Sequence, residues 1–113
     1  MAKRYELLPG TYTILLDYRV AAGVFHEGGA AYQKIQYRYY LGDFNLQSGM
    51  TYTFRPDNIY SPTEICALEE AHDAIGARLN VTGEIRTASP EAKVSGCAQI
   101  ITVAQFDHIF DQP

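Results

Sequence analysis

Basic and aromatic side chains are concentrated between residues 32 and 55. They include Lys34, Arg38, Tyr40, Tyr52 and Arg55. Aromatic rings stack on the bases of single-stranded nucleic acids, while Lys and Arg side chains follow the phosphates. This segment therefore predicts a nucleic-acid site in which Lys34, Arg38 and Arg55 contact phosphates and the two tyrosines stack on bases.

The charge distribution limits this interpretation to one part of the molecule. The chain has 113 residues and a formal net charge of −4. Residues 1–55 hold six basic and four acidic side chains, whereas residues 56–113 hold three basic and nine acidic ones. We therefore expect no attraction of the whole molecule to nucleic acid or to anionic membranes, but a local basic surface on the first half is compatible with the sequence.

Large apolar residues near the C-terminus form a second candidate surface. Phe106, Ile109 and Phe110 either pack against the rest of the domain or bind a partner, which includes a second copy of the chain. Small β-proteins also bury an exposed edge strand against a partner. A protein-interaction or structural module is therefore the leading alternative to nucleic-acid binding.

A third alternative is a small barrel enzyme with an apolar pocket. His26 and Glu27 are adjacent in a glycine-bearing segment, and a His beside a carboxylate can act in general acid–base catalysis. The other histidines, His72 and His108, are far away in the sequence. Neither a metal-ligand spacing nor a nucleotide-binding or nucleophile motif is present, so we expect no metal and no cofactor.

The two cysteines, Cys66 and Cys97, permit two interpretations. They are either independent core thiols or one disulfide, and a disulfide is typical of an exported protein. No apolar stretch approaches the roughly 20 residues that cross a bilayer, and the first residues lack the apolar core of a signal peptide. We expect a cytoplasmic protein, with an exported mature chain as the alternative if the cysteines are bridged.

Residues that alternate between apolar and polar types predict strands in the first half of the chain. These strands span 12–20, about 31–41, and 50–55. The glycine-bearing segment 23–29 breaks the pattern and predicts a loop. Gln-Ser-Gly at 47–49 predicts a tight hairpin turn between the second and third strands.

A helix is predicted over residues 61–76. Ser61 is a favourable N-cap, Pro62 occupies the first helical position, and Glu64 completes a capping box. Gly76 is placed to end the helix. The apolar positions that recur at helical spacing are Ile65, Leu68, His72 and Ile75.

Two further strands, at 79–85 and about 98–106, complete the order βββαββ in a single domain of residues 1–113. This mainly-β α+β order is similar to the OB-fold, a five-stranded, partly open barrel. In the first half, the starts of two strands, 8–13 (LPGTYT) and 46–53 (LQSGMTYT), resemble those of transthyretin-like modules of exported proteins. That resemblance implies a small β-sandwich as the alternative fold.

Overall fold

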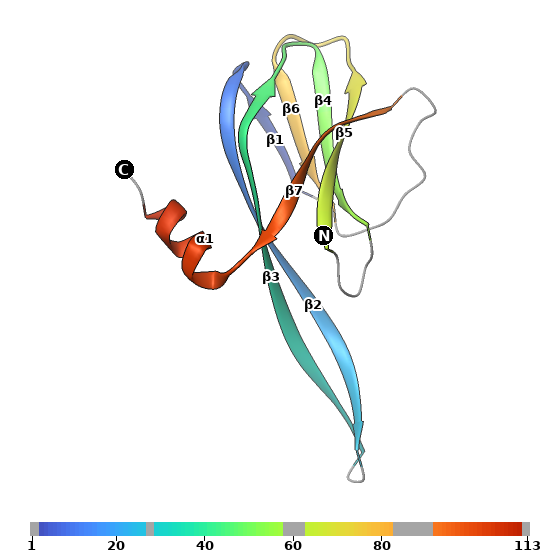
Figure 1. The fold of residues 1–113 in the computed structure, drawn as a ribbon. Helices are drawn as coiled ribbons and strands as arrows, with labels where there is room; N and C mark the ends of the chain where they lie inside the picture. The colour runs from blue at the N-terminus through green and yellow to red at the C-terminus, as the bar shows by residue number, and fades with distance from the viewer. Residues whose placement is uncertain (1–2, 27–28, 58–62, 83–91, 112–113) are drawn as a thin grey trace.

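The computed structural model describes residues 3–26, 29–57, 63–82 and 92–111, and for residues 20–26 and 29–35 it describes the backbone alone. Within these ranges the chain forms seven strands and one helix (Figure 1). The elements are β1 (Lys3–Leu7), β2 (Gly10–His26), β3 (Gly29–Leu46), β4 (Met50–Pro56), β5 (Glu64–Ala71), β6 (Ala77–Val81), β7 (Lys93–Ile101) and α1 (Val103–Phe110).

All seven strands belong to one curled, open sheet. Their order across the sheet is β1-β6-β4-β5-β7-β3-β2, and every pair of neighbours is antiparallel except the parallel pair β4 and β6. The prediction of a mainly-β fold with one helix is confirmed. The five-stranded OB-like order is not matched, because seven strands form the sheet and the helix follows the last of them.

The core covers one side of the sheet, which we call the inner face. It is built from alternate residues of the strands, as the period of two along a strand requires. Aromatic rings in edge-to-face and tilted contact fill its centre, with the Phe44 centroid 5.3 Å from that of Tyr52 and 5.6 Å from that of Phe54. The buried residues of this face include Ile14, Leu16, Tyr39, Phe44, Leu46, Tyr52, Phe54, Ile65, Ala67, Ala77, Leu79 and Ala98. We call the opposite side the outer face.

The predicted helix over 61–76 is wrong. Residues 64–71 form β5, which pairs with β4 on one side and β7 on the other. Ile65 and Ala67 alternate into the core, so the segment follows the strand period. Ser61 and Pro62, which supplied the helix-start signal, lie outside the described residues. Two neighbouring strands satisfy the backbone of this segment, and that outweighs a local capping preference.

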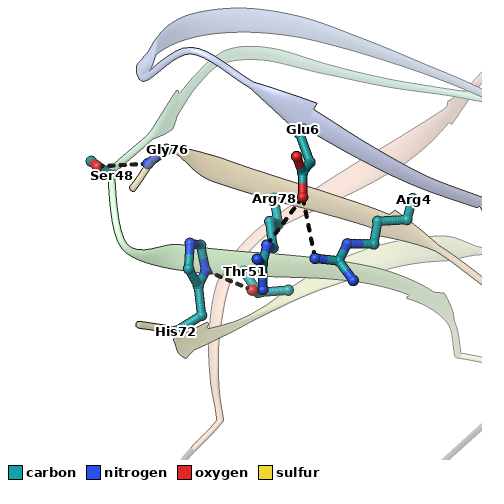
Figure 2. Close-up of polar contacts among 7 residues, drawn as sticks. All are labelled: Arg4, Glu6, Ser48, Thr51, His72, Gly76 and Arg78. Atoms are coloured by element: carbon teal, nitrogen blue, oxygen red, sulfur yellow. Dashed lines mark hydrogen bonds and ion pairs between the residues drawn. The ribbon is translucent and has the colours of Figure 1, made fainter. Parts of the chain in front are cut away.

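The turn at 47–49 is confirmed, but the hairpin is not. Gly49 has a φ of 81°, which glycine adopts without strain. Its N–H donates to the carbonyl of Gly76 at 2.9 Å. The Ser48 hydroxyl accepts from the Gly76 N–H at 3.0 Å (Figure 2). These contacts anchor the turn to the start of β6. As a result β3 and β4 separate after the turn, and β5 and β7 lie between them in the sheet.

Most of the segment predicted as a loop, 23–29, belongs to strands, and residues 27 and 28 lie outside the described residues. β2 continues to His26 and β3 begins at Gly29, with unbroken pairing from Ile14 and Leu41 to the end of the hairpin. β7 pairs only with Arg38–Tyr40 of β3. Beyond that point the hairpin is two-stranded and projects from the rest of the sheet (Figure 1). We call this part, residues 19–26 and 29–36, the arm.

The strand predicted over 98–106 is divided between two elements. β7 ends at Ile101, and α1 begins after Thr102. The Thr102 hydroxyl accepts from the Gln105 N–H at 3.1 Å, while the Gln105 side chain accepts from the Thr102 N–H at 2.9 Å. This reciprocal capping box starts the helix. The same Thr-x-x-Gln signal is visible in the sequence and could have located it.

The remaining strands lie toward the other edge of the sheet. β6 occupies the first part of the strand predicted over 79–85, and residues 83–85 lie outside the described residues. β1 was not predicted, because three of its five residues are charged and its apolar pattern is short. Glu6 accepts a hydrogen bond from the exposed Arg4 at 3.3 Å, and it forms an ion pair at 3.5 Å with the half-buried Arg78 of β6 (Figure 2).

Candidate partner-binding surface

The structure does not bring the five predicted nucleic-acid residues together. Arg38 and Tyr40 lie on the outer face of β3, and Arg55 lies on the outer face of β4. Tyr52 points into the core, is 1% exposed, and accepts a hydrogen bond from the Gln47 N–H at 2.9 Å. Tyr52 is therefore not available to stack on a base. The side chain of Lys34 is outside the description.

Arg38 has a structural contact that the sequence did not reveal. Its guanidinium carbon lies 5.4 Å from the centre of the Phe106 ring, so the cation faces the aromatic ring of α1. Its Nε is buried and has no hydrogen-bond partner among the described residues. Arg38 thus holds α1 against the outer face of β3.

The predicted partner-binding residues of the C-terminal segment all belong to α1. Phe106 and Ile109 are half-buried, whereas Phe110 is 70% exposed. The Phe106 and Phe110 rings are stacked with centroids 6.1 Å apart. No residue of α1 is fully buried. The helix therefore presents apolar surface to its surroundings, and its role as a docking surface stays a prediction.

His72, one of the three histidines of the chain, has a structural contact between two strands. His72 lies just after β5, where its Nδ1 is 2.9 Å from the Thr51 hydroxyl (Figure 2). Its Nε2 is buried, without a hydrogen-bond partner among the described residues. The side chain of His26 is outside the description, as is the whole of Glu27. His72 therefore links β4 to the end of β5.

A half-open hollow of about 390 Å³ lies beside the core. Asp43 and Glu69 contribute carboxylates to its wall, and Phe44 and Tyr52 contribute apolar surface. Asp43 has a φ of 51°, in the left-handed region, where two residues of β3 oppose a single residue of β2. Among its described lining residues there is no histidine, and both Glu27 and the side chain of His26 lie outside the description.

Cys66 and Cys97 form a disulfide between β5 and β7. They are directly opposite one another in the sheet, on the outer face. This resolves the two interpretations of the cysteines in favour of a bridge, which is compatible with an exported form of the protein. Glu64 lies close by, with its ligand atom within 4.8 Å of both sulfurs, but sulfurs in a disulfide are not thiolate ligands for a metal.

The free edge of β2 is the most extensive unsatisfied backbone surface in the described structure. β2 has 17 residues and pairs with β3 along one side. No strand in the described ranges pairs with its other side, and β2 ends the sheet order. An edge of this kind presents a row of N–H and C=O groups to any extended chain that approaches it.

The side chains near the middle of this edge are charged and accessible. Asp17 and Arg19 lie on the outer face, two residues apart, with their charged atoms 3.4 Å from each other. Gln36 of β3 donates to both carboxylate oxygens of Asp17, at 2.8 and 2.9 Å. The Asp17 side chain is 34% exposed and that of Arg19 is 71% exposed. Both charges can therefore meet a partner.

Burial affects the pKa of two tyrosines at this end of the sheet, one in β2 and one in β3. Burial raises the pKa of Tyr18, and it raises the pKa of Tyr39 from 10.0 to about 12, with a smaller contribution from the negative charge of neighbouring Tyr37. Tyr39 is completely buried. Its phenol therefore stays neutral in the folded protein at pH values that ionise it in the unfolded chain.

We expect stability to fall as the pH rises from 10.0 to about 12. In this window the folded protein keeps the Tyr39 proton and the unfolded chain loses it, so the free energy of unfolding decreases with pH. Below this window the contribution is fully present. Urea unfolding measured across the range checks the result. Tyr39→Phe lacks the ionising group and should show a shallower decline, and an equal decline in both proteins would contradict the assignment.

No protein family, curated protein or solved structure matches this chain. Within the described ranges, there is also no helix with the length and apolar character needed to cross a membrane.

Proposed function

We propose that the protein is a non-enzymatic interaction module that binds a protein partner by adding a strand to the free edge of β2. The observation that carries the proposal is the length of this edge. β2 has 17 residues, and no strand in the described structure pairs with the edge that faces away from β3. Most strands are only about 3–10 residues long. Backbone hydrogen bonds along such an edge supply affinity, and the side chains at alternate positions supply specificity.

The arm supports the same proposal. An isolated two-stranded hairpin is marginally stable in water, and a third strand or a packed surface is normally needed. The arm extends beyond the last residue of β3 that pairs with β7, and among the described residues only its own two strands pair there. A partner strand along β2 would supply the third strand of the arm.

Natural proteins commonly protect edges with prolines, bulges or a covering segment. β2 contains no proline along its length. The bulge in the β2–β3 pairing lies in β3. Tyr12 and Ile14 of β2 are two positions apart, whereas their partners Phe44 and Leu41 are three positions apart. The backbone of β2 therefore remains regular and suited to pairing.

A lysine placed on this edge tests the proposal. Leu15 lies on the outer face of β2, and Leu15→Lys should prevent strand addition, as edge lysines do in natural sheets. Val94 of β7 is 62% exposed and lies away from this edge, so Val94→Lys is the matched control. We expect partners captured from an extract of the producing cells by the wild type and by Val94→Lys to be lost with Leu15→Lys. The same proteins retained by all three would overturn the proposal.

Single-stranded nucleic acid is the second candidate ligand. The observation that favours it is that Arg38, Tyr40 and Arg55 share the outer face of the sheet. Its test is the fluorescence anisotropy of a labelled oligonucleotide at low and moderate salt. Binding that weakens steeply with salt, and is weakened by Arg38→Ala for all sequences, supports this candidate. No binding at low salt removes it.

A further inference from the structure

We infer that the partner at the β2 edge is a second copy of this chain, paired antiparallel about a two-fold axis that passes beside Tyr18. The inference rests on the proposed strand addition and specifies its partner and its register. In this dimer the two sheets join into one, with the strands β3 and β2 of one subunit followed by β2 and β3 of the other.

The ends of β2 are symmetric about this axis. Antiparallel self-pairing places residues opposite one another at equal distances from the centre. With Tyr18 at the centre of a strand that runs from Gly10 to His26, Gly10 lies opposite the partner's His26. The full length of the edge is then paired, without an overhanging end on either subunit.

The alternation of side chains restricts the register. An axis midway between two residues would place the inner face of one subunit beside the outer face of the other, because neighbouring residues point to opposite sides of a strand. Only an axis beside a residue keeps the two inner faces on one side. The buried rows of the two subunits then form one continuous surface.

The charged side chains of β2 determine which residue lies beside the two-fold axis. An axis at residue 17 would oppose Asp17 to the partner's Asp17, and an axis at residue 19 would oppose Arg19 to the partner's Arg19. Like charges that are directly opposite destabilise a strand pair, and opposite charges stabilise it. With the axis at Tyr18, Asp17 lies opposite the partner's Arg19, and the symmetric pair repeats this contact. Both side chains are accessible on the outer face.

Apolar positions also match in this register. Ile14 and Leu16 are buried on the inner face, and Val20 and Ala22 hold the strand positions that continue their row. Leu16 then lies opposite the partner's Val20, and Ile14 opposite the partner's Ala22. Each arm thereby lies beside the part of β2 that belongs to the body of the other subunit, which supplies the further strands that a two-stranded arm lacks.

The solution mass gives the first test. Sedimentation of the full chain should give about twice the 12.6 kDa of one chain at micromolar concentrations. Asp17→Lys creates two repulsive pairs in the dimer, as does Arg19→Glu, and each should raise the dissociation constant about tenfold. A wild type that is a monomer at all accessible concentrations would overturn the inference.

Mixing the two variants separates contacts between subunits from the ion pair within one chain. In a mixed dimer, Lys at position 17 of one subunit faces Glu at position 19 of the other, and Arg19 faces the partner's Asp17. We expect mixing to restore the dimer. Mixing cannot restore the Asp17–Arg19 ion pair within either variant chain, so a restored dimer would come from contacts between the subunits. Variants that dimerise as well as the wild type, or folded variants that mixing does not rescue, would contradict the register.

A cysteine on the axis provides a test that does not depend on the folding of the charge variants. Tyr18→Cys places two cysteines opposite one another, and mild oxidation should give a covalent dimer. Thr11→Cys, an exposed position on the same strand, places its two cysteines many residues apart and should not cross-link. Equal cross-linking in both variants, or none in either, would overturn the inference. Partner capture that is lost with Leu15→Lys in a monomeric wild type would retain the proposed function and reject only the dimer.

Discussion

Replacement of Phe54 by alanine is expected to lower the free energy of unfolding by about 4 kcal/mol. Phe54 is completely buried in the middle of the core, and its ring packs 5.6 Å from that of Phe44. The substitution removes a large apolar group and leaves a cavity that a close-packed interior fills only partly. Urea unfolding should show a lower midpoint at an unchanged slope.

Two matched substitutions control this prediction. Phe54→Leu keeps most of the apolar volume and should cost about 1 kcal/mol. Tyr5→Ala removes an aromatic ring that is 44% exposed on β1 and should change stability by about 0.5 kcal/mol or less. Equal losses for Phe54→Ala and Tyr5→Ala would mean that the inner face is not the core of the folded protein.

Loss of the Cys66–Cys97 bridge is the second large effect that we expect. The bridge closes a loop across a sequence separation of 31 residues. A cross-link of this length restricts the unfolded chain and contributes about 3.5 kcal/mol in the loop-entropy description. The double variant Cys66→Ala/Cys97→Ala should therefore unfold at a markedly lower urea concentration than the oxidised wild type.

Reductant provides the control for the disulfide prediction. It should lower the unfolding midpoint of the wild type and leave that of the double variant unchanged. Alkylation followed by intact mass measurement should detect no free thiol in the oxidised wild type and two after reduction. Two alkylated cysteines without reductant would instead support the interpretation of Cys66 and Cys97 as independent core thiols.

The same type of local signal led to opposite outcomes at two places in this chain. Ser61 and Glu64 predicted a helix where β5 forms, whereas Thr102 and Gln105 start a real helix at a place where a strand was predicted. The difference lies in the surroundings. β5 lies between two strands that satisfy its backbone, while residues 103–110 have left the sheet and must form their own hydrogen bonds.

The sequence predicted the strand faces better than the strand neighbours. The alternating pattern over 50–55 predicted a strand, and its alternate residues Tyr52 and Phe54 are both buried on one face. Their strand was expected to form a hairpin with the segment that carries Arg38 and Tyr40, and instead two other strands separate them. The predicted nucleic-acid site depended on that hairpin and on an exposed Tyr52, which the alternation along β4 places in the core.

The sequence by itself determined that this chain is mainly β, that its tyrosines and other apolar residues alternate along strands, and that a turn falls at 47–49. These features follow from local periodicity and turn chemistry, which neighbouring residues encode. Tertiary structure alone decided the sheet order, the bridge between the cysteines and the free edge of β2. Those features depend on pairing between segments far apart in the chain, and each strand is compatible with several neighbours until the shared core selects one arrangement.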